Sequence, residues 1–291
     1  MSPLTLRQTI KTARRIDLFG IVPNRVNDLS LSEILRMPIR IDECAAVVGD
    51  CFEVVDGDRA TIVFDGDHSN CDYVGGGLDS GRIVVAGSVG DFLADRMRGG
   101  AVEVTGSANR FACSGLRGGL VRVAGDCGEY AAAAAPSVNR GMNGGTLVVS
   151  GNCDQWLATR MRRGTVIVHG NVAAACASRM IAGTLVLCGQ VQFPLAANMA
   201  RGTILLLGHQ VVCTAPAGFT NPEHTELSYV QILINDIAPY LPDRMRSEQI
   251  PSVVFRSPVF RALGDRVNRG LGEIIWLNTE LDHADSHLAH A

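Results

Sequence analysis

The chain has 291 residues, of which 47% are hydrophobic, so it can bury a sizeable core. Its 26 basic and 29 acidic residues leave a formal net charge of −3, which excludes bulk electrostatic attraction to nucleic acid or to an anionic membrane. No stretch has the length and apolar purity of a membrane span or of a signal peptide, so we expect a cytoplasmic protein.

Residues 1–60 come before any repeat and contain LSLSEILRMPI, where Ser30 or Ser32 can cap a short helix. A stack of coils has open ends that pair with other chains if they are left bare. We therefore predict that residues 1–60 form an N-terminal cap with a strand and a short helix.

A glycine-bounded repeat occupies residues 61–208. Each copy has a glycine, four or five β-prone residues and a closing glycine, as in GRIVVAG and GTLVLCG. The closing glycines are Gly66, Gly87, Gly106, Gly125, Gly151, Gly170, Gly189 and Gly208. Their steps are 21, 19, 19, 26, 19, 19 and 19 residues.

A period of 19 residues is too short for a helical repeat, so each period should be one coil with one strand. We predict an all-β chain, a right-handed parallel β-helix or solenoid of about 19 residues per coil. Glycine closes each strand because the chain turns sharply there, often with positive φ. We expect that a side chain at Gly170 or Gly189 lowers stability.

Alternation within each strand predicts inward aliphatic ladders, with Ile83 and Val85 in the first copy. A second ladder comprises Leu78, Met97, Leu116, Met142, Met161, Met180 and Met199, which we interpret as core filling rather than a cofactor site. A third comprises Val89, Ala108, Cys127, Cys153, Val172 and Val191. The nine cysteines form no CxxC pair, so we interpret them as buried thiols.

Outward strand positions form an aliphatic column. The column consists of Val84, Val148, Ile167, Val186 and Leu205. An apolar column needs a cover, which is either a partner subunit or one of the chain's own ends. We favour the partner slightly and predict a partner interface at these residues.

The step of 26 adds seven residues, so one coil should bulge into a loop around Ala131 to Arg140. Such an insertion serves binding or is a tolerated bulge, and the two interpretations are about equal.

Arginine recurs with the coil and predicts a positive ridge. The ridge comprises Arg96, Arg98, Arg117, Arg160, Arg162, Arg163, Arg179 and Arg201. Guanidinium groups in such a ridge hold carboxylates or phosphates. Solvated corners that keep the edge soluble are the commoner explanation.

Residues 209–291 are predicted to be a C-terminal extension that caps the other end. HTELSYVQILINDIAPYLPDRM predicts a helix of about three turns before Pro242, and GLGEIIWLN predicts a strand. His283, His287 and His290 have helical spacing, but a frayed end explains them better than a metal site.

Motifs that carry chemistry are missing from the sequence. It has no HExxH, GxSxG, Walker A or paired-cysteine metal motif. We therefore expect no catalytic residue, no metal site and no tightly bound cofactor in this chain.

The repeat resembles a known family. Repeated GN or GD, a variable stretch ending in Met, and then GGxxxVxG are similar to the C-type subunit of formylmethanofuran dehydrogenase and its relative in the bacterial formyltransferase/hydrolase complex. GEYAAAAAPSVNRGMNGG matches that family's longer coil. GDHSNCDYVGGGLDSGRIVV also resembles the C-terminal β-helix domain of the glutamate synthase large subunit. The resemblance covers about residues 50–208.

The resemblance implies a structural subunit without an active site. Companion formyltransferase, amidohydrolase-like and dehydrogenase-like subunits would carry the chemistry that converts formyl-tetrahydromethanopterin to formate through a methanofuran analogue, in one-carbon oxidation of formaldehyde. The arginine ridge would guide the cofactor's polyglutamate tail. The alternative is the C-type subunit of a tungsten or molybdenum formylmethanofuran dehydrogenase. Gly-poor segments, such as residues 175–181, and the long C-terminal extension favour the hydrolase complex.

A third alternative is a glutamate-synthase-like domain. It is weaker because the chain has no amidotransferase or flavin-binding region.

Overall fold

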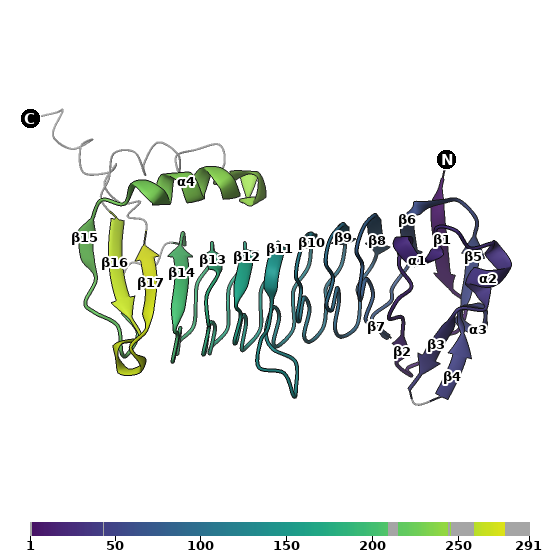
Figure 1. Cartoon of the computed structure of the whole chain (residues 1–291), viewed down its shortest axis with the longest axis horizontal. Helices are drawn as coiled ribbons and strands as arrows, with labels where there is room; N and C mark the ends of the chain where they lie inside the picture. The colour runs from purple at the N-terminus through teal and green to yellow at the C-terminus, as the bar shows by residue number, and fades with distance from the viewer. Residues whose placement is uncertain (1, 43, 209–214, 244, 246–258, 277–291) are drawn as a thin grey trace, which may run out of the picture.

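The computed structural model describes residues 2–42, 44–208, 215–243, 245 and 259–276. The chain is mostly β, with a long sheet along the longest axis of the molecule and a few short helices (Figure 1). In order along the sheet, its strands are β15 (Glu223–Thr225), β16 (Val259–Gly264), β17 (Leu271–Trp276), β14 (Arg201–Leu206), β13 (Thr184–Leu187), β12 (Arg163–Val168), β11 (Asn143–Val149), β10 (Leu120–Val123), β9 (Ala101–Val104), β8 (Arg82–Ala86), β6 (Asp58–Asp65), β1 (Pro3–Gln8) and β5 (Phe52–Val55).

Successive turns of the chain pair in parallel at the predicted spacing. Val166 lies opposite Leu185, 19 residues later, and Leu185 lies opposite Ile204. The ladder of Val89, Ala108, Cys127, Cys153, Val172 and Val191 forms a second row of parallel bridges, which begins at His68. The inward aliphatic residues and the methionine ladder are buried, which confirms their prediction as core.

The N-terminal segment adds a smaller sheet in the order β4 (Cys44–Val47), β3 (Pro38–Ile41), β2 (Ile16–Asp17) and β7 (Cys71–Asp72). Short helices α1 (Pro23–Val26), α2 (Leu31–Leu35) and α3 (Val48–Cys51) accompany it. Ser30 caps α2: its hydroxyl accepts the Glu33 N–H, and the Glu33 carboxylate accepts the Ser30 N–H.

Both ends of the parallel array finish in antiparallel strands. β1 pairs in parallel with β6 and antiparallel with β5, while β17 pairs in parallel with β14 and antiparallel with β16. The sheet therefore runs across the predicted boundaries near residues 60 and 208. The division into three parts remains a prediction.

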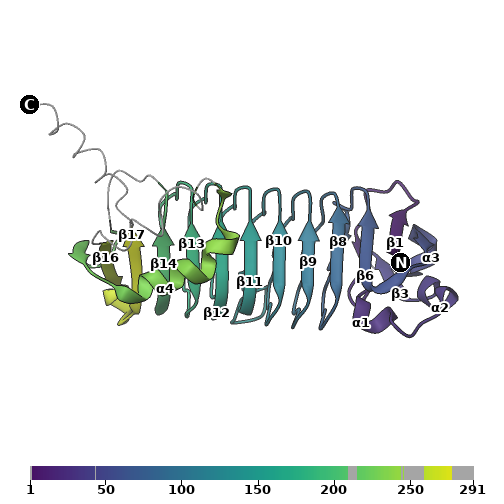
Figure 2. The same ribbon diagram turned by 90° about the horizontal axis from the view of Figure 1, so that it is seen from above.

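Helix α4 (Ser228–Ile237) lies over the outer sheet face and continues into the 3-10 helix η1 (Ala238–Tyr240), as Figures 1 and 2 show. Its residues Val230, Ile234 and Ile237 form a stripe of helical periodicity that is buried against the sheet. The predicted helix and the predicted late strand, β17, are both confirmed. A second 3-10 helix, η2 (Arg266–Asn268), precedes β17.

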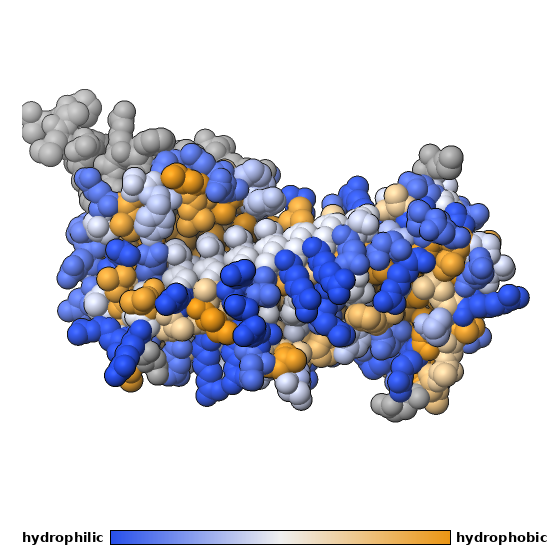
Figure 3. All heavy atoms as spheres, in the orientation of Figure 1, coloured by the Kyte–Doolittle hydropathy of each residue, from blue (hydrophilic) through white to orange (hydrophobic). Residues whose placement is uncertain are grey.

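The aliphatic column is the one prediction that this helix corrects. Val148, Ile167, Val186 and Leu205 are buried with α4, so they do not form an exposed partner interface. The chain covers most of the column itself because α4 supplies a matching apolar stripe. Val84, beyond the end of α4, stays half-buried, and Figure 3 shows hydrophilic side chains over the sheet there.

From Gly87 onward, the closing glycines need their small size rather than a special φ, whereas Gly66 has a positive φ of +112° and open space around its Cβ. A Cβ on Gly189 would lie 2.2 Å from the Gly170 carbonyl oxygen, a backbone atom of the preceding turn. Positive φ is found instead at the glycines that open the strands, such as Gly183 at +118°. The predicted role of the closing glycines in a left-handed turn is therefore wrong for Gly189, where the constraint is the close approach of two backbones.

We predict that Gly189→Ala lowers the free energy of unfolding by about 2 kcal/mol, because the stacked backbones must separate to admit a methyl group. Gly66→Ala is the comparison: no atom lies within 4 Å of its Cβ, so it meets only the strain of φ +112°. Urea unfolding monitored by circular dichroism measures both. Equal costs would contradict a steric origin.

His68 is a buried histidine at the start of the bridge row. Its Nδ1 donates to the Gly66 carbonyl at 2.8 Å, its ring stacks on Phe52 at 6.1 Å, and its buried Nε2 has no hydrogen-bond partner among the described residues. Burial lowers the pKa of His68, because the charged ring would lose its hydration.

We predict that the protein loses stability as the pH falls below about 6.5, the pKa of histidine in an unfolded chain. The unfolded state then binds a proton that the folded state excludes, at a cost of up to about 1.4 kcal/mol per pH unit. His68→Val introduces the residue type that Val89 and Val172 have in the same row. This variant should reduce the dependence of stability on pH. Thermal unfolding of both proteins from pH 7 to pH 5 measures it, and parallel slopes would rule His68 out.

Candidate functional site

At one corner of the stacked turns, three residues per turn have a left-handed backbone conformation. In one turn these residues are Phe92, Ala94 and Arg96, with φ of 60°, 54° and 52°. Gly77 and Gly115 occupy the position of Arg96 in the neighbouring turns, also with positive φ. A non-glycine residue there costs about 1 kcal/mol, and the same conformation recurs in the later turns, at Ala158 and Ala177 for example.

An aromatic ribbon runs along this edge. We give this name to Tyr73, Phe92, Phe111, Tyr130 and Trp156. Successive rings are stacked within 9° of parallel, with centroids 4.7, 5.0, 4.9 and 6.1 Å apart. The rings are half-buried or exposed, so their edges remain accessible. Phe19 of the N-terminal segment packs edge-on against Tyr73, at 6.1 Å.

Sequence reasoning missed the ribbon although the signal was present. Tyr73, Phe92, Phe111 and Tyr130 are 19 residues apart, the period of the coil. Trp156 follows Tyr130 by 26 residues because the insertion lies between them. The positions that continue the series hold Ala175 and Pro194, so the ribbon ends at Trp156.

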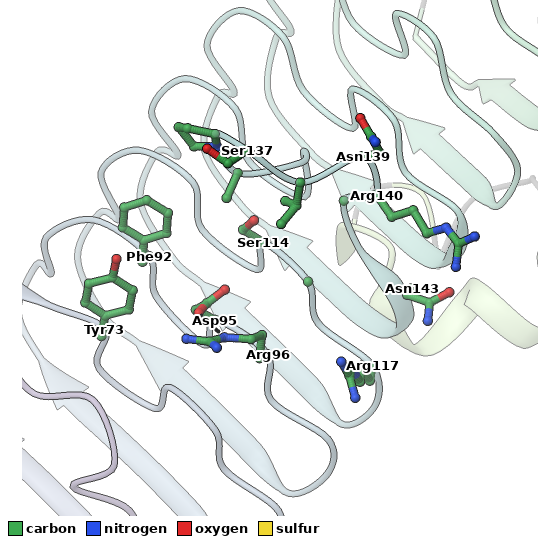
Figure 4. Close-up of a pocket in the computed structure, with 15 residues that line it drawn as sticks. Tyr73, Phe92, Asp95, Arg96, Ser114, Arg117, Ser137, Asn139, Arg140 and Asn143 are labelled. Atoms are coloured by element: carbon green, nitrogen blue, oxygen red, sulfur yellow. Dashed lines mark hydrogen bonds and ion pairs between the residues drawn. The ribbon is translucent and has the colours of Figure 1, made fainter.

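The insertion forms a loop that borders a groove beside the ribbon (Figure 4). The predicted loop is confirmed, with residues 136–140 exposed and projecting away from the side of α4 (Figure 1). Backbone hydrogen bonds anchor its two ends: Ala134 N–H donates to the Thr159 carbonyl at 3.0 Å, and Gly141 N–H to the Arg160 carbonyl at 2.9 Å.

The groove has a cavity volume of about 900 Å³. Tyr73 and Phe92 form one wall, and Val138 and Arg140 of the loop lie on another. Arg117, an exposed residue, also lines it. This mixture of ring edges, an aliphatic side chain and guanidinium groups suits a ligand or partner with both apolar and anionic parts.

Asp95 and Arg96 form a charged pair within the groove. Arg96 Nε donates to Asp95 Oδ2 at 2.8 Å, and its guanidinium lies 4.9 Å from the centroid of the Phe19 ring. Asp95 is 7% exposed, and this burial raises its pKa while Arg96 opposes the shift. The contact with Phe19 thus helps to hold the pair in place.

The predicted arginine ridge divides into two groups. Arg96 and Arg117 line the groove, and Arg98 pairs with Asp79 at 3.5 Å beside them. Arg160 donates from Nη1 to Asn139 Oδ1 of the insertion loop at 2.8 Å. Arg162, Arg163, Arg179 and Arg201 lie at the corners and strand starts of the later turns, where Arg162 is half-buried and the other three are exposed. Arg140, which has no place in the repeat, joins the first group from the loop.

No family model matches the chain. Over 93 residues, the chain is 34% identical to FhcC, the C-type subunit of the Fhc formyltransferase/hydrolase complex of Methylorubrum extorquens. That alignment spans 32% of this chain and only about a third, 34%, of the curated relative.

The structural match is far longer. The chain resembles a chain in the crystal structure of the formyltransferase/hydrolase complex (FhcABCD) from Methylorubrum extorquens in complex with methylofuran, with a TM-score of 0.80 and 31% identity. The match covers 94% of this chain and 99% of that one. The chain belongs to the FhcC family. The long parallel sheet is therefore shared with the FhcC relative almost from end to end.

In the described part of this FhcC homologue, no group of three or more His, Cys, Asp or Glu side chains is placed to hold a metal ion. The helical-spaced histidines His283, His287 and His290 lie outside the described residues. Among the helices that the structure describes, none is long and apolar enough to cross a membrane.

Proposed function

We propose that the chain is a structural, non-catalytic subunit of a formyltransferase/hydrolase complex. In this proposal the stacked turns are a right-handed parallel β-helix of about 19 residues per coil, capped by residues 1–60 and 209–291. The observation that carries the proposal is the full-length match to a chain crystallised within FhcABCD. A likeness over only the repeat would support the fold alone.

The proposed complex converts formyl-tetrahydromethanopterin to formate through a methanofuran analogue, as a step of one-carbon oxidation. Its formyltransferase and amidohydrolase-like subunits carry the two reactions, beside a dehydrogenase-like subunit. The methylofuran in the relative's crystal structure supports a carrier of this chemical class at the level of the complex.

The chemistry of the described side chains agrees with a structural role. Burial raises the pKa of Cys71 and of Cys176 to about 12, so both thiols stay protonated at neutral pH. A protonated thiol is a poor nucleophile. The Asp95 carboxylate in the groove already accepts a hydrogen bond from Arg96.

The test is purification of the tagged chain from its host under mild conditions. We expect formyltransferase and amidohydrolase-like subunits to copurify, because the chain has the architecture of an assembled subunit. Recovery of a lone, stable monomer would contradict the proposal. Bound tungsten or molybdenum with viologen-linked oxidation would instead identify a formylmethanofuran dehydrogenase, and glutamine-dependent activity would identify the glutamate-synthase-like alternative.

We also propose that arginines of the ridge guide the polyglutamate tail of the carrier. Stacking brings Arg160 of one turn beside Arg179 of the next, and Arg162 and Arg163 follow Arg160 in the same turn. Guanidinium groups bind carboxylates through charge-assisted hydrogen bonds. The spacing of adjacent turns, about 4.8 Å, suits successive carboxylates of a flexible chain.

We predict that the triple variant Arg160→Ala, Arg162→Ala and Arg163→Ala raises KM for a long-tailed carrier about tenfold, equal to about 1.4 kcal/mol of binding. A short-tailed carrier should be affected less. Arg7→Ala is the control, since Arg7 lies on β1 and pairs with Asp65. Steady-state kinetics of the purified complex measure both carriers, and equal effects would remove the tail-guiding role.

A further inference from the structure

We propose that the aromatic ribbon and the adjoining groove form the docking site for an extended acidic segment of a companion subunit. This inference rests on the proposed function, because it names the surface through which the subunit would assemble. The surface lies away from α4, which occupies the outer sheet face and shields the aliphatic column there.

Exposed apolar side chains gather along this edge. Trp156 at the end of the ribbon is 37% exposed, and Val138 at the tip of the insertion loop is 49% exposed. Large apolar side chains that remain exposed on a corner, beside guanidinium groups, have the composition of a protein interface. Tryptophan, tyrosine and arginine are also the residues that contribute most to binding at such interfaces.

The charge of the groove specifies an acidic partner. Arg96, Arg117 and Arg140 line the groove together with Asp95 as its acidic residue. Since Asp95 is already engaged by Arg96, the groove retains a net positive charge from Arg117 and Arg140. A docked segment with carboxylates would complete these contacts, and its apolar side chains would lie against the ring edges.

The dimensions favour a chain segment over a compact small molecule. The five rings are separated by four turn spacings of about 4.8 Å, which make the ribbon about 20 Å long. An extended peptide advances about 3.3 Å per residue, so about six residues span the ribbon. The groove runs beside the ribbon from the turn of Tyr73 to the insertion loop, so it can receive side chains along most of that segment.

The test compares a groove variant with a control variant that introduces the same types of substitution elsewhere on the surface of the tagged complex. The groove variant carries Arg117→Glu, Arg140→Glu and Val138→Asp, all at exposed positions. The control carries Arg36→Glu and Ile232→Asp, exposed positions at the end of α2 and on α4. We expect the groove variant to retain companion subunits at least tenfold less than the wild type, while the control retains them.

Two measurements separate docking from misfolding and from failure of the proposed function. Circular dichroism should give the groove variant the wild-type spectrum, and a photo-crosslinker at Val138 in the otherwise unchanged chain should capture a companion segment rich in Asp and Glu. If the wild type recovers no companion subunit, the proposed function fails first. If the wild type does recover companion subunits, three results overturn the docking inference. The groove variant retains as much companion subunit as the wild type, the control loses as much as the groove variant, or the groove variant loses only the carrier.

Discussion

The close backbone approach between successive turns is the constraint on which the rest of the structure depends. Each turn hydrogen-bonds to the one before it, so Gly170 N–H donates to the Gly151 carbonyl at 3.0 Å. A side chain at Gly170 would meet that oxygen at 2.5 Å, so only glycine lets the two backbones keep this distance. Because the stacking is fixed, residues that are 19 positions apart in the sequence lie above one another in a column.

Columns explain both the core and the candidate site. The methionine ladder and the row from Val89 to Val191 are columns that face inward, where flexible thioethers and small side chains such as those of Cys127 and Cys153 fill the cross-section. The aromatic ribbon is a column at the corner, where the left-handed backbone turns ring after ring toward the same side. The same geometry that packs the interior therefore arrays repeated side chains on the surface at a regular spacing.

Sequence reasoning could predict whatever depends on this period. The strands, the inward ladders and the insertion loop follow from glycine spacing and alternation, and the structure bears them out. It could not predict that α4 covers Val148 and Ile167, because the period says nothing about which distant segment folds back over a face. Arg140 was missed for a related reason: a residue inside an insertion has no register, so its place in the groove depends on how the loop folds.

The ribbon was overlooked for a different reason. Its residues recur with the period of the coil, but they are of three different types. Along it the residue types are Tyr, Phe, Phe, Tyr and Trp, and the insertion places Trp156 26 rather than 19 residues after Tyr130. What they share is an aromatic ring on a residue with left-handed backbone conformation, which glycine would adopt with less strain. Rings and arginines at such corners strain the backbone and so lower stability. Their exposed side chains do not recover that stability through packing in the core. The proposed functional surface is therefore the ribbon and groove rather than the sheet face, because α4 already supplies the apolar cover there.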